Sequence, residues 1–195
     1  MAQRRFSHAI AEGDGISVIA AVEDADSARA AEEQRAEALV VRGDPNAVRG
    51  ASSLPILWRA DVPLERASQS ADAYLLVFDA LEEDDGRLEE LHSHAVELGL
   101  DCAVEVRDEE ELERALDRVD PEIFLLSPVE RQDDEAPLDV VLEMLAAVPA
   151  GKLAIADLLL TNREEVQELE RAGCDAVIVH GPEVSPLVDE PPPPV

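Results

Sequence analysis

The eight residues Ala172 to Val179 read Ala-Gly-Cys-Asp-Ala-Val-Ile-Val, and their order is the clearest indication of the fold. Gly173 stands where a helix C-terminus would use the positive φ that glycine tolerates, and Asp175 precedes a short apolar run. The same order, Asp followed by an apolar run, occurs at Ala71-Asp72-Ala73 and at Leu100-Asp101-Cys102. We interpret each stretch as a helix-to-strand connection and their recurrence as a weak internal repeat.

Outward from this stretch, short runs rich in Val, Ile and Leu alternate with polar stretches of helical spacing. This alternation predicts parallel strands joined by crossover helices. The eight runs are Ser17–Val22, Ala38–Val41, Pro55–Trp58, Ala73–Phe78, Cys102–Val106, Ile123–Leu126, Leu153–Ala156 and Ala176–Val179. No Gly-x-Gly-x-x-Gly follows the first run, which argues against an open dinucleotide-binding sheet. We therefore predict an α/β fold, a compact (βα)8 TIM barrel in a chain of 195 residues.

The predicted helices with the best apolar spacing are Glu83–Leu98, Asp108–Leu116, Leu138–Ala147 and Arg163–Ala172. The segments Gly43–Leu54 and Ala60–Asp72 leave room only for short helices, so we predict short second and third βα units. One barrel domain is expected over residues 1–189. Residues 190–195 are expected to form a proline-rich tail, because a proline run continues neither a helix nor a sheet.

The composition excludes several classes of function. A formal charge of -29 disfavours binding to nucleic acids and anionic membranes, and no basic patch offsets it. No apolar run approaches the length that a membrane span needs, so we expect a cytoplasmic protein with neither kind of partner. Cys102 and Cys174 each enter an apolar run, and we interpret both as buried thiols rather than metal ligands. No cofactor is predicted.

In such barrels the active site lies at the C-terminal ends of the strands. The charged and polar residues that follow the predicted strands are Glu23, Arg42, Arg59, Asp79, Glu105, Ser127, Asp157 and His180. Two interpretations stay open for the central ones: catalytic carboxylates, or a structural ion pair of Arg59 with Glu105. A metal site of His180 with Glu105 and Asp157 is a further hypothesis, although our main expectation is no metal. Lys152, the single lysine, precedes the seventh run and should lie at the opposite end.

The order of these segments resembles indole-3-glycerol phosphate synthase, a barrel enzyme of tryptophan biosynthesis. The similar stretches are Phe6–Ile10 with Ser17–Ala20, Leu54–Leu57, Val104–Leu112, Asn162–Val166 and Ala172–Val179. The resemblance covers nearly the whole chain and implies a lyase that closes an indole ring with loss of carbon dioxide and water. The long N-terminal extension of that family, which adds a helix before the first strand, is expected to be missing here.

The resemblance also implies which catalytic residues to look for. The family uses a lysine on the third strand as general acid, and the matching position here is Arg59. The first-strand Glu-x-Lys pair is replaced by Ala21 and Glu23. The fifth-strand carboxylate is retained as Glu105, and the seventh-strand Glu is shortened to Asp157. Because an arginine stays protonated at ordinary pH, we expect the acid step to be lost.

The substrate-binding positions implied by the resemblance are also altered. Ser127 stands where the family has Asn-x-Arg on the sixth strand, and Gly181 alone could still offer an open backbone N–H to a phosphate. We therefore expect a barrel that has lost the ring-closing decarboxylation and acts as a binding or interaction module. Its partner would be an anionic small molecule at the strand ends, or a protein that meets the acidic surface or the tail. The alternative is an active synthase or related lyase that uses Arg59, Glu105 and Asp157 on an anionic substrate.

Overall fold

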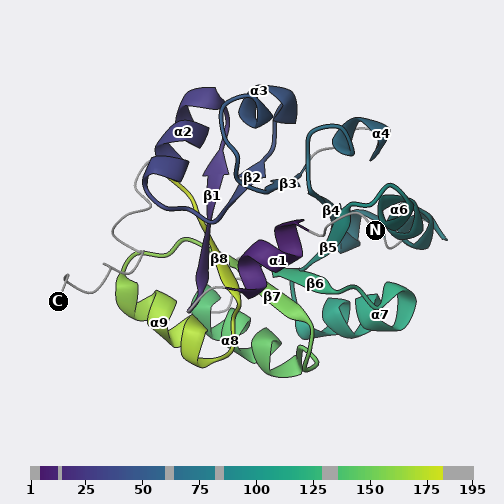
Figure 1. Cartoon of the computed structure of the whole chain (residues 1–195). Helices are drawn as coiled ribbons and strands as arrows, with labels where there is room; N and C mark the ends of the chain where they lie inside the picture. The colour runs from purple at the N-terminus through teal and green to yellow at the C-terminus, as the bar shows by residue number, and fades with distance from the viewer. Residues whose placement is uncertain (1–4, 13–14, 60–63, 82–85, 129–135, 182–195) are drawn as a thin grey trace.

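The computed structural model describes residues 5–12, 15–59, 64–81, 86–128 and 136–181, and its strands form one closed parallel barrel (Figure 1). The eight strands neighbour one another in chain order, and β8 pairs with β1. They are β1 (Ser17–Val22), β2 (Ala38–Val41), β3 (Ile56–Trp58), β4 (Ala73–Val77), β5 (Asp101–Val106), β6 (Ile123–Leu126), β7 (Leu153–Asp157) and β8 (Ala176–Val179). The predicted TIM barrel is confirmed.

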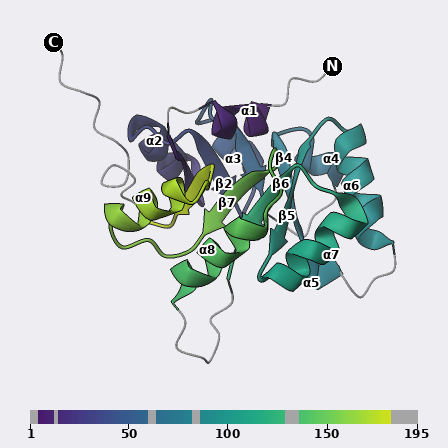
Figure 2. The same cartoon turned by 90° about the horizontal axis from the view of Figure 1, so that it is seen from below.

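Most of the helices surround the strands on the outside of the barrel, whereas α1 lies over its centre (Figures 1 and 2). The described ones are α1 (Arg5–Ala11), α2 (Ala25–Glu33), α3 (Pro45–Arg49), α4 (Leu64–Ala67), α5 (Phe78–Leu81), α6 (Arg87–Glu97), α7 (Glu109–Val119), α8 (Pro137–Ala147) and α9 (Arg163–Arg171). The prediction of short second and third units is confirmed, because α3 has five residues and α4 has four. None of the described helices could cross a membrane, being too short or too polar. The predicted tail, residues 190–195, lies outside the described residues.

Side chains alternate along each strand between the barrel interior and the helix layer. The interior cluster includes Ile19, Val40, Leu57, Leu75, Ala103, Leu125, Ile155 and Ile178. The outer cluster joins the opposite face of the strands to the helices, and both predicted core thiols, Cys102 and Cys174, are buried in it. Leu57, Ala103 and Ile155 face the interior, and the residue two positions after each of them faces inward too but is charged. The apolar interior therefore ends where the candidate site begins.

The helix α1 closes the N-terminal end of the barrel. Phe6 and Ile10 are buried in the interior cluster, and Ser7 N–H donates to Asp101 Oδ2 at the start of β5, 2.7 Å away. Figure 2 shows α1 and α5 at opposite ends of the barrel. No helix was predicted from the sequence over these residues, which precede β1. The helix α1 lies at the end of the barrel remote from the candidate site.

The recurrent acid before a strand has a structural role at the same end. Asp72 Oδ2 accepts a hydrogen bond from Ile56 N–H at 3.0 Å, and Asp175 Oδ2 accepts one from Ala154 N–H at 2.8 Å. In both cases an acid before one strand binds a backbone amide in the preceding strand. Glu37, which precedes β2, binds the Val18 N–H of β1 in the same way at 3.0 Å. These bonds satisfy strand-end amides, as buried backbone groups require.

Candidate functional site

Four charged or titratable side chains form a continuous network across the C-terminal mouth of the barrel. Arg59, after β3, places Nη2 2.7 Å from Glu105 Oε1 on β5 and Nη1 3.1 Å from Asp157 Oδ2 on β7. Asp157 Oδ1 is joined to His180 Nε2, after β8. We call Arg59, Glu105, Asp157 and His180 the mouth network. Alternate strands of a TIM barrel send side chains to the same level, which explains why β3, β5 and β7 meet here.

Burial and neighbouring charges make the two carboxylates of the mouth network unequal. The side chains of Glu105 and Asp157 are only 6% and 7% exposed. Burial raises the pKa of Glu105, with the charge of Asp157 adding to the shift and Arg59 opposing it. Burial also opposes the ionisation of Asp157, but its hydrogen bond and attraction to His180, with the charge of Arg59, outweigh this and lower its pKa. Asp157 is therefore the anionic centre, and Glu105 is the easier of the two to protonate.

The two oxygens of Glu105 differ. Oε1 accepts from Arg59, whereas Oε2 is buried without a hydrogen-bond partner in the part of the chain that the structure describes. Ser127 lies close enough to favour the ionised form of Glu105, and its backbone N–H donates to Val106 O at 3.0 Å. An unpaired buried oxygen on an ionised carboxylate is costly, which agrees with the raised pKa of Glu105.

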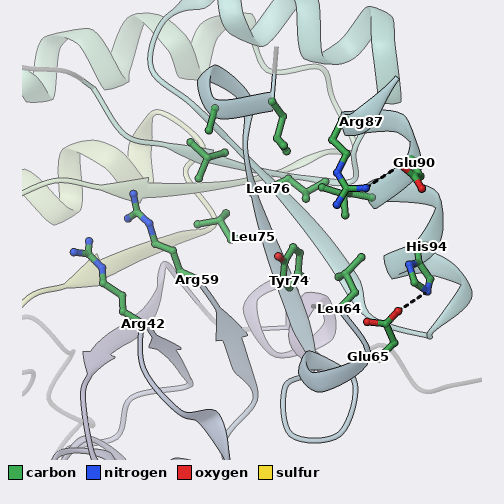
Figure 3. A pocket seen from close by; sticks show the side chains of 14 residues that line it. Arg42, Arg59, Leu64, Glu65, Tyr74, Leu75, Leu76, Arg87, Glu90 and His94 are labelled. Atoms are coloured by element: carbon green, nitrogen blue, oxygen red, sulfur yellow. Dashed lines mark hydrogen bonds and ion pairs between the residues drawn. The ribbon is translucent and has the colours of Figure 1, made fainter. Parts of the chain in front are cut away.

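Two cavities adjoin the mouth network, and Arg42 and Arg59 line both. The smaller, about 240 Å³, is lined by Ala21, Val22, Glu23, Val40, Arg42, Arg59, Asp157, His180 and Gly181. The larger, about 820 Å³, extends along β4 toward α4 and α6 and has walls of mixed apolar and charged side chains. In Figure 3, Arg42 and Arg59 lie side by side with their guanidinium groups pointing the same way. The ion pairs Arg87–Glu90 and His94–Glu65 lie at the other end of this cavity.

Arg42 differs from Arg59 because it makes no hydrogen bond or ion pair with the residues that the structure describes. It is exposed at the end of β2 and acts on Asp157 at longer range, helping to lower the pKa of that carboxyl. A guanidinium without a paired carboxylate can bind an anion without first breaking an existing contact. The sequence had identified Arg42 as a strand-end residue but gave no reason to separate it from the others.

The structure brings together most of the residues predicted from the sequence. Arg59 contacts both Glu105 and Asp157, and Gly181 lies beside them in the small cavity, with φ of 128°. Lys152 Nζ lies 2.7 Å from Asp120 Oδ1, next to the start of β7 and thus at the opposite end of the barrel. Among the described residues, no three His, Cys, Asp or Glu side chains are arranged to hold a metal ion.

The family model of indole-3-glycerol phosphate synthase matches residues 17–182, which includes the whole barrel and every member of the mouth network. The chain belongs to this family. A curated relative, the indole-3-glycerol phosphate synthase of Salinibacter ruber (strain DSM 13855 / M31), is 37% identical over 119 residues. The matched part covers 60% of this chain and 42% of the relative, so it spans less than half of the relative's length.

Solved structures with the same fold include enzymes of different names. N-acetylmannosamine-6-phosphate 2-epimerase from Clostridium perfringens has a TM-score of 0.71 at 13% identity, covering 85% of this chain and 86% of that chain. A mutant α-subunit of tryptophan synthase from the hyperthermophile Pyrococcus furiosus has a TM-score of 0.66 at 14% identity, covering 84% and 86%. At such low identity these two likenesses show the barrel fold alone.

Proposed function

We propose that this member of the indole-3-glycerol phosphate synthase family does not carry out the ring-closing decarboxylation and instead binds a small anionic molecule at the mouth of its barrel. The observation that carries the proposal is the position of Arg59, held between Glu105 and Asp157. The resemblance implies that this arginine matches the strand-end lysine that serves the family as general acid. Its charge is used to hold two nearly buried carboxylates together.

Among the described residues at the mouth, no lysine replaces the family's proton donor, and the imidazole of His180 is already joined to Asp157. An arginine has a pKa above about 12 and keeps its protons at neutral pH. Lys152 is at the far end, paired with Asp120. The raised pKa of Glu105 would suit an acid, but its Oε2 is buried and Glu105 lines neither cavity.

Binding of an anion is supported by the charge that surrounds the small cavity. Two arginines, Arg42 and Arg59, line it beside the acids Glu23 and Asp157, in a chain whose formal charge is -29. Arg59 is already paired with Glu105 and Asp157, whereas Arg42 has no ion pair among the described residues and can attract a ligand. A local concentration of cationic groups in a recess can attract small anions even when the net charge of a protein is negative.

A catalytic alternative has two observations in its favour. The relative from Salinibacter ruber is named as an indole-3-glycerol phosphate synthase. Arg59, which holds both carboxylates of the mouth network, lines a cavity of about 820 Å³, within the usual range for small-molecule sites. In that case Arg59, Glu105 and Asp157 would act on an anionic substrate of the family's type.

One assay separates the two functions. The protein is incubated with 1-(2-carboxyphenylamino)-1-deoxyribulose 5-phosphate while indole fluorescence is followed, with the Salinibacter ruber synthase as positive control. We expect no product from this chain, even at enzyme concentrations equal to the substrate. Turnover that disappears in Glu105→Gln would establish catalysis at the mouth network and refute our proposal.

A further inference from the structure

The helix N-termini around the mouth are occupied by the protein's own carboxylates. In a βα barrel each crossover helix begins beside the mouth, where its free amides and dipole would favour a phosphate group. Within the described ranges, every helix of nine or more residues has acids in its first turn. They are Asp26 in α2, Glu89 and Glu90 in α6, Glu109, Glu110 and Glu111 in α7, Asp139 in α8, and Glu164 and Glu165 in α9.

At α2 and α9 the first amides are also engaged in hydrogen bonds. Asp24 Oδ1 accepts from the N–H groups of Asp26 and Ser27 at 3.1 and 2.8 Å. At α9, Asn162 Oδ1 accepts from Glu165 N–H at 3.0 Å, and the Glu165 carboxylate accepts from Thr161 N–H at 2.7 Å. A phosphate would have to displace these groups and approach their negative charges.

The start of α7 is closed in a similar way. Asp108 Oδ1 accepts from Glu111 N–H at 2.9 Å, and Glu111 Oε2 accepts from Arg107 N–H at 2.8 Å. The helix α8 begins with Pro137, which has no N–H to offer. Side chains therefore cap the first amides of α2, α7 and α9. The helices α6 and α8 have no such cap, but both have acids in their first turns.

What remains for an anion is a guanidinium in a small recess. Arg42, without an ion pair among the described residues, lines the 240 Å³ cavity together with His180 and the small side chain of Ala21. This volume lies below the roughly 300 to 1,000 Å³ of typical small-molecule sites. A planar guanidinium matches the two oxygens of one carboxylate, and Asp157 and Glu23 in the same wall disfavour a second negative charge on the ligand.

We propose that the 240 Å³ cavity binds a small monocarboxylate that has no phosphate group, with the carboxylate held by Arg42. This inference rests on the proposed function and narrows it, because it distinguishes between two kinds of anion. A compact carboxylate with a single charge pairs with Arg42 and is repelled less by Asp157 and Glu23 than an anion with two charges would be. A phosphate monoester has a second charge, and every described helix of nine or more residues already has at least one acid in its first turn.

The test compares two ligands that share a two-carbon tail and differ in their anionic group. Propionate and ethyl phosphate are titrated separately, at matched ionic strength and pH 7, into the isotope-labelled full chain. Binding is followed by the NMR shifts of the Gly181 amide and the Arg42 Nε–H. The same titrations are made on Arg42→Gln and on a control, Arg29→Gln, in which the exposed Arg29–Asp26 pair on α2 is removed.

We expect propionate to shift the Gly181 resonance with an affinity at least tenfold above that of ethyl phosphate. Arg42→Gln should weaken propionate binding at least tenfold, and Arg29→Gln should leave it unchanged. Equal or tighter binding of ethyl phosphate, or binding that Arg42→Gln does not alter, overturns the inference but leaves anion binding at the mouth intact. If neither ligand shifts Gly181, the anion-binding part of the proposed function falls with it.

Discussion

The two ends of this barrel use the same residue types for different purposes. At the N-terminal end, Glu37 and Asp175 each accept a backbone N–H from the neighbouring strand, and α1 covers the interior. At the C-terminal end, Glu105 and Asp157 are held by the side chains of Arg59 and His180, beside two cavities. Acids bound to backbone are fixed by the topology. Acids bound to side chains can change partners while the barrel remains, so function can diverge at that end.

The largest effect is expected where α1 closes the N-terminal end. Phe6 is fully buried in the interior cluster, so Phe6→Ala should lower the free energy of unfolding by about 3 to 5 kcal/mol, the usual cost of truncating a buried aromatic. Urea denaturation followed by circular dichroism measures this. A loss below about 1 kcal/mol would mean that α1 contributes little to closing the barrel, and the contrast between the ends would fail.

At the mouth, removing the shared cation should cost somewhat less. Arg59→Met leaves Glu105 and Asp157 close together without their counter-ion, which we expect to cost about 2 to 4 kcal/mol at pH 7. The value falls below that of a fully buried pair because Arg59 is 25% exposed. Arg29→Met is the matched surface control and should change stability by less than about 0.5 kcal/mol.

A companion variant separates charge from packing at the mouth. In Arg59→Met combined with Glu105→Gln and Asp157→Asn, no uncompensated carboxylate remains, so most of the lost stability should return. If the triple variant is as unstable as Arg59→Met alone, the mouth network contributes through shape rather than charge. The difference between the two ends in how their acids are held would then be unsupported.

The strand-end acids of the N-terminal end should have smaller and more uniform effects. Asp175→Ala leaves the Ala154 N–H without its acceptor, at a cost of about 1 to 2 kcal/mol. Asp175→Asn keeps an acceptor oxygen and should recover about half of that loss or more. Both are measured by urea denaturation. Equal losses in the two variants would indicate that the carboxylate charge, rather than the hydrogen bond, matters at this end.

The strands could be predicted from the sequence with errors of at most one residue at either end, for a physical reason. Parallel strands buried on both faces are continuous apolar runs. Runs such as Ile123–Leu126 and Ala176–Val179 are flanked by polar or turn residues, which mark where each strand begins and ends. The helix α1 was missed because it is short and buries only Phe6 and Ile10. Two apolar residues four apart are too few to indicate a helix.

The candidate site was predictable in its members but not in its contacts. Position at the C-terminal end of a strand identified Arg59, Glu105 and Asp157. The alternation of side chains along a strand places all three inside the barrel. The carboxylate that Arg59 contacts depends on the direction of its side chain, which the sequence does not indicate. In the structure Arg59 contacts both Glu105 and Asp157. The role that we propose for Arg42 could not be predicted from the sequence. It depends on Arg42 having no ion-pair partner among the described residues, including those distant from it in the sequence.

The smallest predicted effect is a change in the slope of stability against pH, and it tests the inequality of the two mouth carboxylates. The pKa of Glu105 is raised in the folded protein, so the folded state binds more protons and stability falls as pH rises from the ordinary Glu pKa of about 4.3. The pKa of Asp157 is lowered. Its contribution is present above the ordinary Asp pKa of about 3.9 and is lost as pH falls through the folded value.

Removing each carboxylate should therefore tilt the pH profile in opposite directions. Relative to the unmodified chain, Glu105→Gln should gain free energy of unfolding as pH rises through the window above about 4.3, whereas Asp157→Asn should lose it as pH rises through the window below about 3.9. Urea denaturation at intervals between pH 3 and 7 gives both difference curves. Parallel curves would mean that the two acids are equivalent. The mouth would then be a symmetric clamp around Arg59, without the single anionic centre at Asp157 that the structure indicates.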